Sequence, residues 1–148
     1  MPFRFPLETL LRFRRSVERQ HELLLQEANL HVNLVQHRIE QVHHSMIDLA
    51  AREIMELEKG MGAAELHFDA ACRSILLQHE HELRKELKAV EERRDACLQG
   101  YRHAHQERDV IDTLRDHHLE AYRREESRRE QRGLDEMFLL RREFLRRG

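Results

Sequence analysis

Histidine is the residue type that first suggests chemistry, because twelve histidines occur in a chain of 148 residues. They include the motifs HEH at 79–81 and HAH at 103–105. A metal site on one helix needs ligands at i and i+4, as in HExxH, and no two of these histidines are three or four residues apart. On a helix, the HxH spacing turns the two side chains about 200° apart. We therefore predict no metal site and expect the histidines to be solvated or to flank a helix interface.

The cysteines and the carboxylates form no catalytic pattern either. Cys72 and Cys97 belong to no CxxC motif, so we interpret both as small hydrophobic residues whose thiols stay reduced. Acidic runs such as Glu91, Glu92 and Asp95 are typical of a solvated helix face. The chain also lacks a glycine-rich phosphate loop and a GxSxG motif. We predict that the chain is not an enzyme and needs no cofactor.

Charge is distributed unevenly along the chain, although the net charge is only −2. Residues 1–20 carry +3 and residues 115–148 carry +2, whereas residues 21–114 carry −7. The arginines of the C-terminal segment are interleaved with acids, so they form no uncompensated stripe that could follow a phosphate backbone. Nucleic acid is therefore not an expected partner.

The composition predicts long helices that would carry these residues. Ala, Glu, Lys, Leu and Arg make up 80 of the 148 residues, Trp is absent, and there are only five Gly and two Pro. A helix-breaking signal occurs only in EKGMGAAE at 58–65, where two glycines flank Met61. We expect a single all-α coiled-coil domain, 1–148, with a helix at about 6–59, a turn at about 60–62 and a helix at about 63–146. Pro6 is expected at the first helical position. No apolar run approaches the roughly 20 residues of a transmembrane segment.

Apolar residues recur every seven positions on both sides of this turn. The repeats are Leu25, Val32, Ile39 and Met46 before it, and Leu76, Leu83, Val90, Cys97, Ala104 and Ile111 after it. Such repeats predict an antiparallel two-helix coiled-coil hairpin with a longer second helix.

A turn centred on Met61 also predicts the register of the two helices. It places Met46 opposite Leu76, Ile39 opposite Leu83, Val32 opposite Val90, Leu25 opposite Cys97 and Leu11 opposite Ile111. Upstream of Leu25 the apolar positions shift in sequence to Leu10, Phe13, Val17 and Leu24. That shift predicts a stutter that loosens the supercoil toward the termini.

The two ends of the chain carry a family resemblance. The segments FRFPLETLLRFRR at 3–15 and REQRGLDEMFLLRREF at 129–144 resemble the terminal motifs of the FliJ family of bacterial flagellar type III export. The resemblance implies a stalk that inserts into the hexameric export ATPase ring, contacts the cytoplasmic domain of the membrane export gate and escorts export chaperones. It also implies a cytoplasmic location with peripheral association at the inner membrane of the flagellar base.

Because a hairpin brings its two ends together, the basic, Leu- and Phe-bearing segments are expected to form one docking end. The residues expected to bind the export ATPase are Arg4, Phe5, Leu7, Leu10, Leu11, Arg14, Leu134, Asp135, Glu136, Met137, Phe138, Arg141 and Arg142. Those expected to bind the export gate are Leu66, Phe68 and Leu76. The alternatives are a generic structural coiled coil, such as a self-associating spacer, and the related stalk protein of a virulence type III secretion system.

Overall fold

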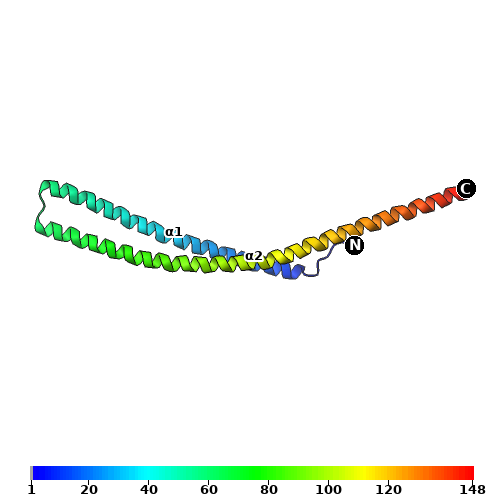
Figure 1. The fold of residues 1–148 in the computed structure, drawn as a ribbon, viewed down its shortest axis with the longest axis horizontal. Coiled ribbons are helices and arrows are strands. Elements are labelled where there is room, and N and C mark those ends of the chain that lie inside the picture. The colour runs from blue at the N-terminus through cyan, green and yellow to red at the C-terminus, as the bar shows by residue number, and fades with distance from the viewer. Residues whose placement is uncertain (1) are drawn as a thin grey trace. The chain divides into compact units, whose positions relative to one another are not determined.

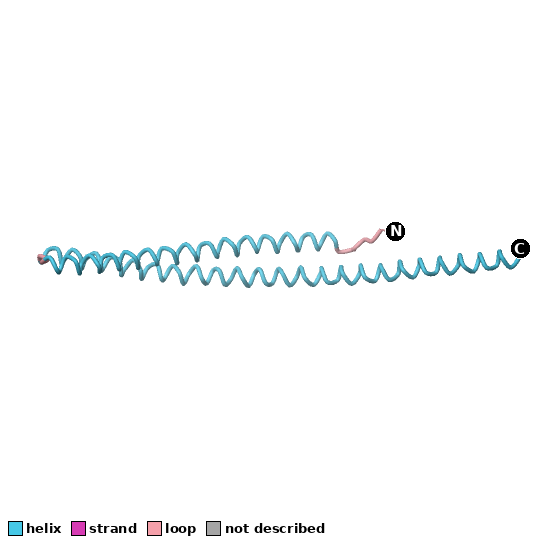
Figure 2. The backbone as a smooth tube through the Cα atoms, turned by 90° about the horizontal axis from the view of Figure 1, so that it is seen from above, coloured by secondary structure: helices cyan, strands magenta, loops and turns pink. Residues whose placement is uncertain are grey.

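The structure, a computed structural model, describes residues 2–148. These residues form two helices, α1 (Glu8–Lys59) and α2 (Ala63–Arg147), and no strand occurs among them. The helices contain 52 and 85 residues and run antiparallel on the two sides of a short loop (Figure 2). The predicted fold class, an antiparallel two-helix coiled-coil hairpin with a longer second helix, is confirmed.

Glycines make the connection between the two helices. Gly60 ends α1 with a φ of 86°, a left-handed conformation that residues with a Cβ rarely adopt. Its N–H donates to the carbonyl oxygen of Leu57 at 3.3 Å. The carbonyl oxygen of Gly62 accepts a hydrogen bond from the Leu66 N–H at 3.2 Å, at the start of α2. The turn thus lies at residues 60–62, where α1 meets α2 in Figure 1.

The N-terminus differs from the expectation for Pro6. The N–H of Glu8 donates to the carbonyl oxygen of Phe5 at 3.2 Å, which closes a turn with Pro6 at its second position. The fixed φ of proline suits that position of a turn as well as it suits the first residue of a helix. Helix α1 therefore begins at Glu8, two residues after Pro6.

The chain divides into two compact units. Unit 1 combines Met1–Arg19 with His103–Gly148, and unit 2 is Gln20–Arg102. Both basic terminal segments therefore belong to unit 1, whereas unit 2 contains the turn and most of the acidic segment. The expected single domain remains a prediction, and each unit is described separately below.

Unit 2 has an apolar core in the predicted register. Ile39 and Leu83 lie in one buried cluster together with Val35 and Val42, and its edge is covered by half-buried hydrophobic residues. The residues at that edge are Met46, Leu76, Leu87 and Val90.

The other end of unit 2 shows why α2 contains an isolated glycine. A Cβ atom on Gly100 would lie 3.1 Å from Nδ1 of His21, closer than an ordinary van der Waals contact. The absence of a side chain at Gly100 therefore lets the His21 ring pack against the backbone of α2.

Unit 1 has a smaller core that fastens the N-terminus to α2. Phe5, Leu11 and Ile111 form the buried cluster, and Leu11 has no exposed surface. Phe5 meets the His118 ring edge-on with centroids 5.4 Å apart, and Phe3 packs on Tyr122 at 5.5 Å. Leu11 and Ile111 thus share one cluster, as the register predicts.

The predicted stutter is wrong. Leu10, Phe13 and Leu24 are exposed by 38%, 58% and 46%, so these apolar residues do not form the helix interface. The seven-residue repeat instead continues from Leu11 to Glu18, which is largely shielded from solvent. The stutter was predicted from apolar side chains alone, whereas the helix interface in unit 1 also contains charged residues.

A charged layer occupies this polar part of the interface. The Glu18 carboxylate accepts hydrogen bonds from the Arg108 guanidinium and lies 3.1 Å from Nδ1 of His105. Arg108 also donates to Oδ2 of Asp112 at 2.8 Å. The hydrogen bond from Arg108 lowers the pKa of Glu18 below its ordinary value, although partial burial opposes the shift, and the same pairing raises the pKa of Arg108. Both groups therefore stay ionised at neutral pH, and a shifted register would leave them unpaired.

The register of unit 2 predicts one specific disulfide. In a Cys72→Ser background, a Leu25→Cys variant should cross-link to Cys97 under mild oxidation, because a disulfide requires Cα atoms within about 7 Å. The measurement is the fraction of monomer that migrates faster on a non-reducing gel. Leu23→Cys is the matched control, since Leu23 lies on the exposed side of α1. Equal cross-linking from both positions would contradict the register.

Candidate functional site: protein-interaction surfaces

The C-terminal part of α2 is the most exposed region of unit 1. Every residue from Ser127 to Gly148 is exposed except Gly133, which is half-exposed. In Figure 1 this segment, drawn in orange to red, continues beyond the N-terminal residues of the same unit with no other helix beside it. The packing of unit 1 therefore does not use its side chains.

One side of this segment is apolar. Leu134, Met137, Phe138 and Leu145 lie at positions i, i+3, i+4 and i+11, which share one side of a helix, and Phe138 is 66% exposed. At about 100° per residue, Leu140 and Phe144 extend the same side. We name these six residues the C-terminal apolar face.

Leu140 and Phe144, two members of this face, were not predicted from the sequence. Phe144 lies seven residues after Met137, and this heptad spacing was sufficient to find it.

Arg141 projects from within the face, whereas Arg142 and Asp135 project from its border and Glu136 from the polar side. Leu139 is also exposed but points away from the face.

The N-terminal residues expected to bind the ATPase divide into two groups. Leu7 and Leu10 are exposed and remain available to a partner. Phe5 and Leu11 are buried in the core of unit 1, so they support the surface instead of forming it.

The expected arginines at the N-terminus divide in the same way. Arg4 is exposed, whereas Arg14 is half-buried and is ion-paired with Glu107. Among residues 2–148, Arg14 is thus already paired, whereas Arg4 has no ion-pair partner and is available to orient a bound protein.

The two halves of the expected docking end are not contiguous. The N-terminal aromatic residues reach α2 at His118 and Tyr122, and Leu134 follows Tyr122 by a further 12 residues. At 1.5 Å per residue this separation is about 18 Å along α2. Unit 1 therefore presents two separate surfaces, one at Leu7 and Leu10 and one at the C-terminal apolar face.

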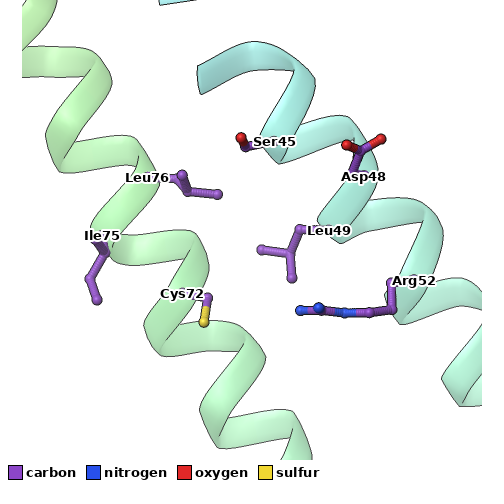
Figure 3. A pocket seen from close by; sticks show the side chains of 7 residues that line it. All are labelled: Ser45, Asp48, Leu49, Arg52, Cys72, Ile75 and Leu76. Atoms are coloured by element: carbon purple, nitrogen blue, oxygen red, sulfur yellow. The ribbon is translucent and has the colours of Figure 1, made fainter. Parts of the chain in front are cut away.

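A groove lies between α1 and α2 of unit 2, close to the turn. It has a volume of about 480 Å³ and is lined by Ser45, Asp48, Leu49, Arg52, Cys72, Ile75 and Leu76. Figure 3 shows Leu49 and Leu76 pointing toward one another from the two helices, with Arg52 reaching across below them. We name this hollow the turn-proximal groove.

Small side chains explain why the groove is open. Ser45 and Cys72 flank the helix interface at positions where coiled coils usually carry long charged residues. Their small size leaves Leu76 half-buried at the groove, whereas Leu49, of which only 7% is exposed, lines the groove from the buried interface. The thiol of Cys72 is free, so in this fold it acts as a small apolar wall.

The residues expected to bind the gate lie near this groove but not all within it. Leu76 lines the groove, and its other side packs against the core of unit 2. Phe68 is 64% exposed and lines a neighbouring hollow together with Arg52 and Asp69. Leu66 is exposed and lines neither hollow.

The described residues limit what these surfaces can do chemically. No group of three or more His, Cys, Asp or Glu side chains in residues 2–148 is arranged to hold a metal ion. Within the same range, neither helix has a stretch that is apolar and long enough to cross a bilayer. The surfaces that remain are exposed apolar faces with adjoining charges, which are typical of protein–protein contact.

These features define a helical-hairpin coiled coil that presents interaction surfaces. The sequence model of a family described as flagellar FliJ protein matches residues 3–148. The chain therefore belongs to the FliJ family and is a component of flagellar protein export. No curated protein and no solved structure matches it.

The exposure of the C-terminal segment predicts how truncation affects stability. Deletion of residues 133–148 should leave the thermal unfolding midpoint nearly unchanged, because no side chain in this segment is buried. Circular dichroism at 222 nm measures the midpoint. A Leu11→Ala variant is the contrasting control and should lower it, since emptying a fully buried leucine site typically costs about 2–5 kcal/mol. A large fall on truncation would show that the segment is structural.

Proposed function

We propose that this chain is a non-catalytic, cytoplasmic stalk and adaptor of the flagellar type III export apparatus. Its C-terminal apolar face binds the hexameric export ATPase, and its turn-proximal groove binds the cytoplasmic domain of the membrane export gate. The protein associates peripherally with the inner membrane at the flagellar base and escorts export chaperones. Membership of the FliJ family favours this flagellar role over a virulence secretion stalk or a generic spacer.

The observation that carries the proposal is the C-terminal apolar face itself. Six large apolar side chains lie on one side of a helix that has no α1 partner in unit 1. Exposed apolar surface of this extent is costly in water and usually marks a binding surface. A stalk that enters a ring needs such a surface on a helix segment that does not pack against the other helix of its hairpin.

Charge supports the orientation of the bound helix. Arg141 projects from within the C-terminal apolar face, so a bound partner must supply an acceptor or leave this guanidinium unpaired. Arg142 borders the same face and adds a second cation. An ATPase surface that combines an apolar pocket with a carboxylate opposite Arg141 fits this arrangement.

The turn-proximal groove supports the second contact. It is lined by the buried Leu49 and the half-buried Leu76 between two helices, and such a hollow can accept an apolar side chain of a partner segment. Arg52 and Asp48 stand at its border and can orient polar groups of that segment. Phe68, in the neighbouring hollow, extends the apolar area toward the turn.

The first functional prediction concerns the export ATPase. The isolated chain should hydrolyse no ATP, whereas its stoichiometric addition to the purified ATPase should raise the activity or the assembly of the ring. Phe138→Ala should weaken binding by about 1–3 kcal/mol if Phe138 is an anchor of the interface. Calorimetry or biolayer interferometry measures the affinity, and phosphate release measures the activity.

Leu139→Ala is the matched control for this experiment. Leu139 is exposed on the same turn of α2 but points away from the C-terminal apolar face, so its truncation should leave binding unchanged. Equal loss from both variants would indicate a helix defect rather than a face-specific contact. Undiminished binding by a chain without residues 133–148 would contradict the proposal.

A second prediction concerns the export gate. Phe68→Ala should weaken binding to the purified cytoplasmic domain of the gate several-fold, because it removes a large exposed ring beside the groove. Leu77→Ala is the control, since Leu77 is also exposed but lines neither hollow. If both variants bind as tightly as the unsubstituted chain, the gate contacts another surface.

A further inference from the structure

Asp69 is a buried acid at the helix interface of unit 2, close to the turn. Only 4% of its surface is exposed. Its Oδ1 atom lies 3.5 Å from a guanidinium nitrogen of Arg52. Its Oδ2 atom is buried and receives no hydrogen bond from any residue in the range 2–148. A buried acceptor without a donor destabilises a fold, so this oxygen needs an explanation.

Glu56 of α1 lines the same hollow as Asp69, with 39% of its side chain exposed. Arg52 is the cation that both acids share, at 3.8 Å from Glu56 and 3.5 Å from Asp69. The neighbouring Glu53 is already paired with Arg73.

Glu65, a further negative group, also lies near this pair. Two ionised carboxylates beside the single guanidinium of Arg52 would leave one uncompensated negative charge at the interface. The repulsion between them favours the uptake of one proton by the pair.

We propose that Glu56 and Asp69 hold one proton between them, with the Glu56 carboxyl group donating a hydrogen bond to Oδ2 of Asp69. The proton supplies the missing donor, and it balances the charge of the pair against Arg52. The pair thus forms an acid-sensitive clamp between α1 and α2 beside the turn-proximal groove. In agreement, burial raises the pKa of Glu56 above its ordinary value of 4.5, and the nearby Asp69 charge raises it further.

The sign of the pH effect follows from this raised pKa. Folding favours protonation of Glu56, so its contribution to stability grows as the pH falls from neutral toward 4.5. Glu80, whose pKa is lowered by hydrogen bonds from His43 and then Arg84, loses its stabilising effect only as the pH falls below 4.5. Between pH 7 and pH 4.5, protonation of Glu56 therefore adds stability while the stabilising effect of Glu80 is unchanged.

A Glu56→Gln variant of the full chain tests the clamp. Its amide carries a permanent donor for Oδ2 of Asp69, so the unfolding midpoint at pH 7 should rise by about 2–4 °C. The variant should also gain less stability than the unsubstituted chain between pH 7 and pH 5. Glu58→Gln removes the same charge from an exposed neighbour without supplying a donor, and it should change neither quantity.

Carboxyl ¹³C NMR of the unsubstituted chain gives an independent measurement. One glutamate resonance, which is absent from Glu56→Gln, should titrate above pH 4.5. If that variant does not fold, a single high-titrating glutamate in the unsubstituted chain still supports the clamp. The clamp is excluded if every glutamate titrates at or below 4.5, or if Glu56→Gln lowers the midpoint as much as Glu56→Ala.

Discussion

The burial of a narrow apolar strip between two helices is the constraint on which this structure depends. A pair of helices has only one shared face, so the cluster around Ile39 and Leu83 forms a buried apolar core in unit 2. All other sides of both helices remain in water. This geometry leaves a large surface for partners, which agrees with an export component of the FliJ family.

Charged residues replace apolar ones at selected positions of that strip, and they have different consequences. Glu18 and Arg108 form a balanced pair in unit 1, so the pKa of the acid falls and the layer stays ionised. Asp69 and Glu56 in unit 2 form an unbalanced pair beside Arg52; desolvation raises the pKa of Glu56, and the Asp69 charge raises it further. Balanced charges specify which residues face each other, whereas an unbalanced pair makes the contact depend on pH.

The proposed binding surfaces lie where α1 and α2 do not fully cover each other. The C-terminal apolar face lies on residues of α2 that have no α1 partner, and the turn-proximal groove lies where the small side chains of Ser45 and Cys72 leave Leu76 half-buried. Arg52 lines the groove and also contacts Asp69, so binding in the groove and protonation of the acid pair involve one common side chain. Both surfaces follow from what the apolar strip leaves uncovered.

The sequence by itself determined the helices, the turn and the register, because heptad spacing and paired glycines are local signals that a helix converts directly into geometry. It also placed Phe138 among the residues expected to bind a partner. Only the tertiary structure decided that Leu10 and Phe13 are exposed and that Glu18 takes a position at the helix interface. The partner of Glu18 is Arg108, about 90 residues away, and no local apolar pattern records such a long-range charge pairing.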